Sequence, residues 1–175
     1  MPALLFKRIN LDWLYPPFRD RLLEVIAQCS SRGADYVAQQ GLRSWQEQDQ
    51  LYRIGREFPG NKVTNAKGGQ SQHQFGLAVD FVRDSDTKTP GLQPDWSDSA
   101  YDILIEELGK AGLHSGVGYR DRPHAGWPDY YKLPELNDLA KVYNLNTGPV
   151  PVRLQRVWEY VTAHSTPLPK YPETP

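Results

Sequence analysis

Two histidines and one aspartate have the residue types and the spacing of a metal site. His73 and Asp80 lie in the stretch GGQSQHQFGLAVDF, and His124 follows in DRPH. Asp80 falls inside the apolar run LAVDFV, which predicts a short buried strand. An unpaired buried carboxylate is strongly unfavourable, whereas a carboxylate that ligates a cation is tolerated. Two neutral imidazoles and one carboxylate would leave a fourth position open for water, as in a catalytic zinc site.

The residues around this trio resemble a known family. VTNAKGGQSQHQFGLAVDF, followed by DRPH, is similar to the LAS-type zinc peptidases of peptidoglycan, and the motif S-x-H-x-x-G-x-A-x-D is complete over residues 71–80. The group includes D,D-carboxypeptidases, D-Ala-D-Ala dipeptidases and L-alanyl-D-glutamate endopeptidases. GLRSWQEQDQLYRIGR further resembles the L-alanyl-D-glutamate branch. The resemblance covers residues 39–127 and implies an α+β fold of the hedgehog/D-Ala-D-Ala peptidase type, with a small antiparallel sheet flanked by helices.

The resemblance also implies roles for individual residues. His73, Asp80 and His124 match the zinc ligands, and Asp121 matches the catalytic carboxylate of the endopeptidase branch. The implied reaction is hydrolysis of the peptidoglycan stem peptide, at the L-alanyl-D-glutamate bond, by a water at the zinc that Asp121 activates. A structural alternative for Asp121 is a turn residue that caps the following DRP segment.

Two further positions match substrate-binding residues of the family. Arg43 and Ser71 correspond to positions that hold carboxylate or carbonyl groups of the substrate, and Arg43 is also assigned to the catalytic set. An arginine can fork onto a carboxylate, which suits a stem peptide rich in D-Glu or diaminopimelate carboxylates. The alternatives are a surface arginine and an ordinary loop serine. The chain departs from the family after the last ligand, where it has Ala125-Gly126-Trp127, and this leaves the support of His124 open.

Two other functions compete with the endopeptidase. A D,D-carboxypeptidase or dipeptidase on the same fold would have a glutamate in the place of Asp121. A non-catalytic cell-wall-binding module would use zinc only as a structural staple, and a carboxylate beside an open metal position would then have no use. Asp121 therefore favours the endopeptidase over both alternatives.

Composition limits the partners and the location that we expect. With 20 Lys+Arg against 21 Asp+Glu, the chain has no basic field that would favour nucleic acid. Cys29 is the single cysteine, so an internal disulfide and a cysteine-based metal site are excluded. No apolar run is long enough for a membrane anchor. We expect a monomer made in a host cytoplasm without a signal peptide, which fits a bacteriophage endolysin released to the wall by a holin.

The elements that position these residues alternate irregularly. The resemblance implies a catalytic domain over residues 1–133. The family has no counterpart for the rest, where helical patterns predict an extension over 134–175 that packs on the same domain. Strands without regular βαβ alternation favour the α+β class. The predicted helices cover 16–33, 44–55, 99–113 and roughly 134–144 and 151–163, and the predicted strands cover 35–43, 75–82 and short pieces within 114–127.

Overall fold

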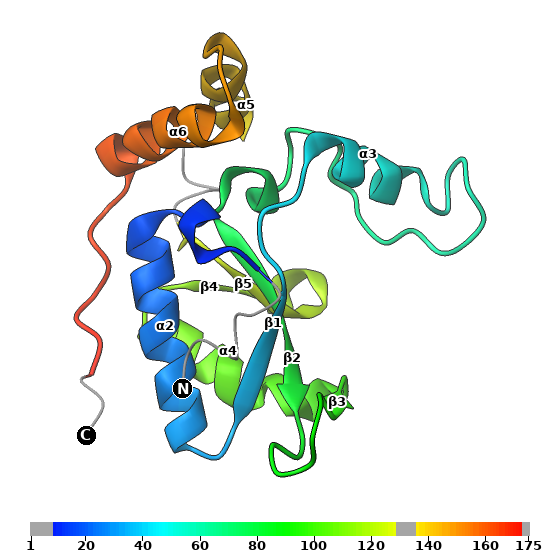
Figure 1. Ribbon diagram of the computed structural model, residues 1–175, viewed down its shortest axis with the longest axis vertical. Helices are drawn as coiled ribbons and strands as arrows, with labels where there is room; N and C mark the ends of the chain where they lie inside the picture. The colour runs from blue at the N-terminus through cyan, green and yellow to red at the C-terminus, as the bar shows by residue number, and fades with distance from the viewer. Residues whose placement is uncertain (1–8, 129–135, 173–175) are drawn as a thin grey trace.

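An antiparallel sheet forms the centre of the fold (Figure 1). The computed structural model describes residues 9–128 and 136–172. The strands run in the order β1–β2–β5–β4, and β3 pairs with the C-terminal end of β2. The predicted α+β class and small antiparallel sheet are confirmed. The strands are β1 (Asp35–Gln40), β2 (Ala78–Asp84), β3 (Pro94–Asp95), β4 (His114–Gly116) and β5 (Asp121–Gly126).

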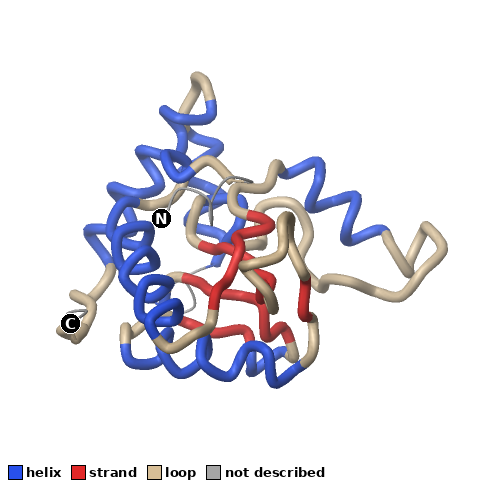
Figure 2. The backbone as a smooth tube through the Cα atoms, turned by 60° about the horizontal axis from the view of Figure 1, so that its bottom comes forward, coloured by secondary structure: helices blue, strands red, loops and turns tan. Residues whose placement is uncertain are grey.

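The helices cover the sheet and extend the molecule at one end. Figures 1 and 2 show α2 and α4 side by side against the strands, α5 and α6 together at one end, and α3 with its following loop reaching away from the body. Among the described residues, no helix has the length and apolarity needed to cross a membrane. The helices are α2 (Pro16–Ser31), α3 (Trp45–Arg53), α4 (Asp102–Lys110), α5 (Leu136–Leu145) and α6 (Val150–His164).

Helix α2 forms where the sequence predicts it and buries the predicted face. Prolines occupy its first turn, where a missing N–H has no intrahelical partner to lose. Its buried residues are Phe18, Leu22, Val25, Ile26 and Cys29. Burial raises the pKa of the Cys29 thiol to about 12, so this cysteine is a small apolar core residue rather than a reactive thiolate.

The predicted strand over residues 75–82 starts later than expected. Residues Gln72–Phe75 form the 3-10 helix η2, and the backbone then turns at Gly76, which has a left-handed φ of 67°. A Cβ at Gly76 would lie 2.3 Å from the carbonyl oxygen of Trp13, so only glycine fits this turn. The first part of the prediction is therefore wrong, because η2 and the tight turn occupy the residues before β2.

The capping box before α3 is present. The Ser44 hydroxyl accepts a hydrogen bond from the Glu47 backbone N–H at 3.2 Å, and the Glu47 carboxylate accepts one from the Ser44 N–H at 2.8 Å. Two N–H groups at the start of the helix are thus satisfied. Helix α3 follows β1 in the chain, and its residue Leu51 lines the cavity described below.

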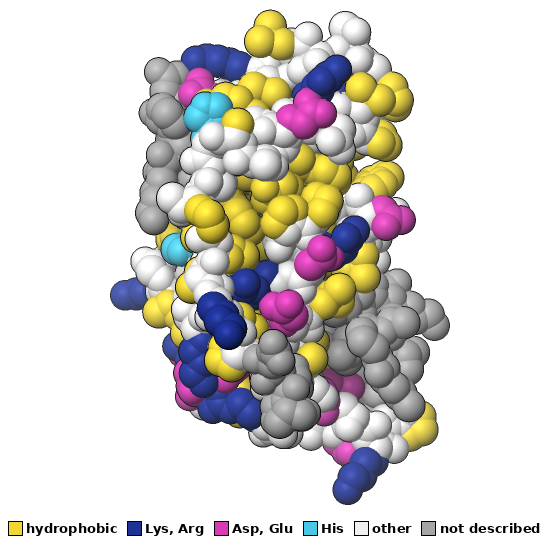
Figure 3. Space-filling model, turned by 90° about the vertical axis from the view of Figure 1, so that its left-hand side faces the viewer, with side chains coloured by type: hydrophobic (Ala, Val, Ile, Leu, Met, Phe, Trp, Pro, Cys, Tyr) yellow, Lys and Arg dark blue, Asp and Glu magenta, His cyan; other side chains and the backbone are white. Residues whose placement is uncertain are grey.

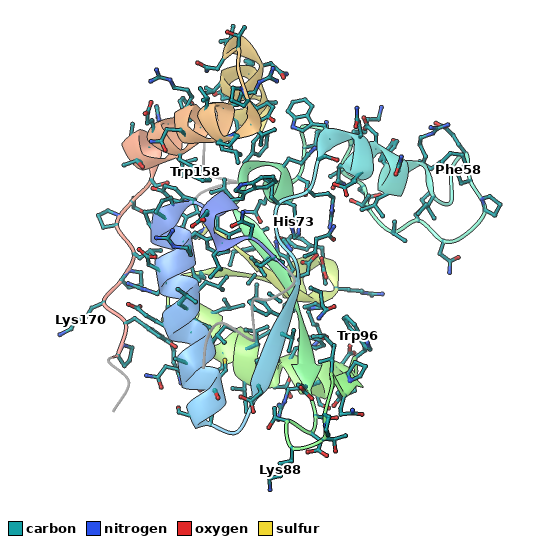
Figure 4. The ribbon with its side chains drawn as sticks, viewed as in Figure 1. Phe58, His73, Lys88, Trp96, Trp158 and Lys170 are labelled. Atoms are coloured by element: carbon teal, nitrogen blue, oxygen red, sulfur yellow. The ribbon has the colours of Figure 1, made fainter. Side chains whose placement is uncertain are left out.

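The C-terminal helices pack against η2. The indole N–H of Trp158 on α6 donates to the carbonyl oxygen of Phe75 at 2.8 Å, and Figure 4 shows Trp158 on the side of α6 that faces the rest of the fold. Leu139 of α5 and Val157 of α6 are fully buried in the same core as α2. Residues 129–135, where the predicted boundary between the two segments falls, lie outside the described residues, so the division at residue 133 stays a prediction.

A buried carboxylate ties the C-terminal segment to α2 and α4. Glu107 of α4 is 4% exposed and accepts a hydrogen bond from the Tyr171 hydroxyl at 2.6 Å. It also lies 2.5 Å from the Arg32 guanidinium and 2.8 Å from the Lys110 ammonium. Burial raises the pKa of the Glu107 carboxyl, but its hydrogen bonds together lower the pKa by more, so the pKa lies below its ordinary value.

Replacing Glu107 by alanine is expected to lower the free energy of unfolding by about 1–3 kcal/mol, because buried partners lose a charged acceptor. Because the pKa is lowered in the folded state, this contribution is present above the unfolded-state pKa and is lost as the pH falls through the folded-state value. Urea unfolding at pH 7 and in acid would measure both effects. Glu159→Ala, which removes an exposed carboxylate paired with Arg156, should change little. Equal effects of the two substitutions would contradict the anchoring role.

A hollow lies on the face that α2 and the C-terminal segment share. Figure 3 shows apolar side chains gathered near the middle of this face. The hollow has a volume of about 430 Å³, and Tyr15, Trp127 and Leu168 contribute to its lining. None of its lining residues belongs to the predicted site. The three predicted metal ligands and Asp121 line a different cavity.

Candidate metal centre

The fold brings His73, Asp80 and His124 together. Each offers one ligand atom, and these atoms all lie within 4.8 Å of one another. The Nε2 atom of His73 lies 3.3 Å from Asp80 Oδ2, and the Nδ1 atom of His124 lies 3.1 Å from Asp80 Oδ1. The register of the sheet explains the second contact, because Asp80 of β2 is directly opposite His124 of β5. His73 comes from η2, immediately before β2.

The outer nitrogen of each imidazole has an acceptor. His73 Nδ1 lies 2.9 Å from the Gly41 carbonyl oxygen, and His124 Nε2 lies 3.0 Å from the side-chain oxygen of Gln72. A carbonyl oxygen can only accept, so the outer nitrogen carries the hydrogen in the neutral form of each ring. The inner nitrogen of each ring then presents a lone pair toward Asp80. This donor set, two imidazole nitrogens and a carboxylate, fits zinc.

Asp80 is the charged centre of this cluster, and its side chain is 23% exposed. Burial raises the pKa of its carboxyl, but His73 and His124 lower it by more, so the pKa lies below its ordinary value. Asp80 is thus tolerated in an apolar strand because its carboxylate has charged and polar partners. Its carboxylate faces two imidazoles and lies 3.6 Å from the Arg43 guanidinium.

A cavity of about 690 Å³ opens over the three residues. In Figure 4, His73 lies near the centre of the molecule, beneath the start of α3, while Phe58 lies far out on the loop after α3. Residues 63–66 of this loop line the cavity, as do residues 119 and 120 in the turn before β5. The lining includes Arg43, Thr64, Ser71, Tyr119, Arg120 and Asp121.

Asp121 lies at the edge of the cavity, beside the cluster. Its side chain is 52% exposed, and its Oδ2 atom lies 4.0 Å from His124 Nδ1. Burial by the cavity walls raises the pKa of its carboxyl, and the negative charge of Asp80 raises it further. A carboxyl group with a raised pKa near a metal site has the properties of a general base. The chemical role itself stays a prediction.

Arg43 follows β1 and is only 9% exposed, so its interpretation as a surface residue is wrong. One terminal nitrogen donates to the Gln48 side-chain oxygen at 2.7 Å, and the other donates to the Gln40 side-chain oxygen. Burial lowers the pKa of Arg43, although Asp80 opposes this effect. The guanidinium is therefore held in a fixed orientation at the cavity wall.

Ser71 and Gln48 shape the same wall. Ser71 is half-buried at the start of η2, and its backbone N–H donates to the Gln74 side-chain oxygen at 3.0 Å. Gln48 is fully buried and donates to the Ala66 carbonyl oxygen at 2.7 Å, which ties the loop over residues 63–66 to α3. Both residues line or support the cavity, and the substrate-binding role of Ser71 stays a prediction.

Sequence reasoning missed two residues at the centre. Gln72 contacts His124 although the motif leaves its position unspecified, and only its place between two motif residues pointed to it. Tyr119 is 49% exposed, lines the cavity and has its ring 6.3 Å from that of His124. Arg120 follows it with a left-handed φ of 61°, the one positive φ among the described non-glycine residues. This turn brings the side chains on either side of it to the cavity.

Comparison with known proteins identifies the family. The model described as "VanY: D-alanyl-D-alanine carboxypeptidase" matches residues 13–115, a range that includes His73 and Asp80 and ends before Asp121 and His124. The peptidoglycan L-alanyl-D-glutamate endopeptidase CwlK of Bacillus subtilis (strain 168) is 44% identical over 69 residues. That alignment covers 39% of this chain and 41% of the length of the relative. Since the family match spans more than half of the sequence and carries the first two members of the metal cluster, the chain belongs to the VanY peptidase family.

Proposed function

We propose that the chain is a peptidoglycan-degrading zinc endopeptidase that hydrolyses the stem peptide at the L-alanyl-D-glutamate bond. The observation that carries the proposal is the cluster of His73, Asp80 and His124 with Asp121 beside it in one open cavity. The similarity to CwlK, which is named for this bond, supports the choice of substrate.

Each residue has a distinct part in the proposed reaction. His73, Asp80 and His124 would hold zinc, which when bound lowers the pKa of water and polarises the scissile carbonyl. Asp121 would accept a proton from the attacking water at its carboxylate and give a proton to the leaving amine nitrogen. General acid–base catalysis of this kind typically contributes ~10²–10⁴-fold. Burial and the negative charge of Asp80 raise the pKa of the Asp121 carboxyl, which makes its carboxylate a stronger proton acceptor.

Arg43 and Ser71 would position the substrate. The buried Arg43 guanidinium faces the cavity from a fixed orientation, and its permanent charge suits a D-Glu or diaminopimelate carboxylate. Ser71 lies on the same cavity wall and would hydrogen-bond to a carbonyl group. The proposal therefore places the anionic part of the stem peptide between η2 and the segment after β1.

The Arg43→Lys variant is expected to lose about 10- to 100-fold in kcat/KM, because lysine keeps the charge but lacks the planar fork. Turbidity clearance of purified peptidoglycan, with zinc content as a parallel measurement, would show the loss. Arg156→Lys, on the exposed side of α6, is the matched control and should behave as wild type. Wild-type rates for Arg43→Lys would remove Arg43 from the substrate-binding set.

A D,D-carboxypeptidase or dipeptidase activity is the second candidate. The printed description of the matching family, D-alanyl-D-alanine carboxypeptidase, favours it. The aspartate at position 121, where that branch has a glutamate, favours the endopeptidase. Mass spectrometry of the products from purified peptidoglycan separates the two. A new N-terminal D-Glu would support cleavage of the L-alanyl-D-glutamate bond, whereas free D-Ala would support the carboxypeptidase. Muropeptides that stay uncleaved would favour a non-catalytic wall-binding module.

The endolysin role stays a prediction. In this role a bacteriophage encodes the enzyme, and the enzyme accumulates in the host cytoplasm. The enzyme then reaches the wall after a holin opens the inner membrane. Expression in a bacterial cytoplasm with and without a co-expressed holin tests it. Lysis that depends on the holin would support the role, and lysis that occurs equally without it would contradict holin-dependent release.

A further inference from the structure

We propose that Gln72 is a positioning residue for the metal centre. We further propose that position 126 is a glycine because any side chain there would collide with the Gln72 amide. The inference rests on the proposed zinc site and adds two residues that the family motif leaves unspecified. It also explains how this chain supports His124 although the residues after that ligand, Ala125-Gly126-Trp127, depart from the family pattern.

The contacts of Gln72 leave its amide one orientation. Its side chain is 3% exposed and lies between the Trp127 carbonyl oxygen at 2.9 Å and His124 Nε2 at 3.0 Å. The Trp127 oxygen can only accept, so the amide nitrogen of Gln72 must face it. The amide oxygen of Gln72 therefore faces His124 and accepts the hydrogen of Nε2. His124 Nδ1 is then the nitrogen that faces Asp80.

Gly126 lies where any side chain would displace this amide. A Cβ at Gly126 would lie 2.3 Å from the side-chain oxygen of Gln72 and 3.1 Å from His124 Nε2. Its backbone is not in the left-handed region, so conformational freedom does not explain the glycine. The close approach of Gln72 does. Gly126 pairs with Ala78 across the sheet, which leaves it no freedom to move away.

The two residues thus act as a unit that orients His124 from outside the ligand set. An acceptor on the outer nitrogen fixes the ring orientation and increases the basicity of the inner nitrogen, and losing such a partner typically weakens metal binding ~10- to 100-fold. Gln72 comes from the same 3-10 helix as His73, so η2 supplies one ligand directly and orients another.

The test is a double-mutant cycle on zinc affinity, measured by competition with a chelator of known affinity. Gln72→Ala should bind zinc ~10- to 100-fold more weakly than wild type. Gly126→Ala should weaken zinc binding in the wild-type background and weaken it less when residue 72 is already alanine, because the closest contact, 2.3 Å from the Gln72 oxygen, is then gone and only the 3.1 Å contact with His124 remains. Gly118→Ala is the matched control, since a Cβ there meets no atom within 4 Å.

A second readout does not use activity. In the zinc-loaded protein, the hydrogen on His124 Nε2 should exchange slowly with water by nitrogen-15 NMR, and Gln72→Ala should make it exchange fast. Wild-type zinc affinity and slow exchange in Gln72→Ala would overturn the proposal, as would an equal effect of Gly126→Ala in both backgrounds. If Gly126→Ala does not fold, Gln72→Ala decides by itself. A wild-type protein that binds zinc but cleaves no stem peptide would contradict the proposed function alone.

Discussion

Replacing His124 by alanine is expected to remove zinc, heat stability and peptidase activity together. His124 contributes one of three ligand atoms that lie within 4.8 Å of one another, and the remaining two cannot hold zinc in a four-coordinate site with comparable affinity. Zinc that binds the folded state at about 100 times its Kd adds ~2.7 kcal/mol of stability. For a chain of this size, that loss corresponds to a fall in Tm of roughly 5–10 °C.

The measurements are elemental analysis, thermal unfolding and peptidoglycan turbidity on the same preparations. Zinc-depleted wild type should unfold below the zinc-loaded protein but not below His124→Ala, because the substitution removes the buried contacts of His124 with Asp80 and Gln72 as well as the zinc. His164→Ala is the matched control, since His164 lies exposed at the end of α6. A His124→Ala protein with full zinc content would show that the metal binds elsewhere in the chain.

Replacing Asp121 by asparagine is expected to give a different pattern: zinc and Tm unchanged, turnover reduced by at least ~10²-fold. Asparagine keeps the shape of the side chain but cannot accept the proton of the attacking water. Asp121 lies 4.0 Å from His124 Nδ1 and is half-exposed, so its loss leaves the three ligand atoms in place. Burial and the charge of Asp80 raise the pKa of the Asp121 carboxyl, and the substitution removes this ionisable group while its surroundings stay the same.

Asp98→Asn is the control for this substitution, because Asp98 is an exposed aspartate outside the cavity. Single-turnover kinetics on a soluble stem peptide would separate the chemical step from binding. A zinc-free Asp121→Asn protein would make Asp121 a ligand and place one of the three assigned ligands in doubt. Wild-type turnover with full zinc would refute its role as the general base.

Much of the site could be predicted because its signals are local. The apolar stripe of α2, the capping box at Ser44 and Glu47, and the carboxylate of Asp80 within an apolar strand each depend on neighbours in sequence. A charged residue in an apolar strand needs a partner, so the sequence around Asp80 predicts a nearby cation. The resemblance to the family then identified His73 and His124 as the histidines that lie beside Asp80.

The rest depends on contacts between distant segments. The 3-10 helix η2 and its left-handed turn at Gly76 follow from the closeness of Trp13, which periodicity does not reveal. The support of His124 by Gln72 joins residues 52 apart in sequence. Arg43 is buried because Gln40 and Gln48 enclose its guanidinium, whereas its sequence neighbours alone suggested a choice between cleft and surface.

The measurement that tests the central claim most directly is a zinc titration of chelator-treated wild type, with peptidoglycan cleavage followed at each addition. We expect activity to rise in proportion to bound zinc and to stop rising at one zinc per chain, whereas His124→Ala should show no such endpoint. Full cleavage by the zinc-free protein, or activity that ignores the amount of zinc bound, would contradict the central claim.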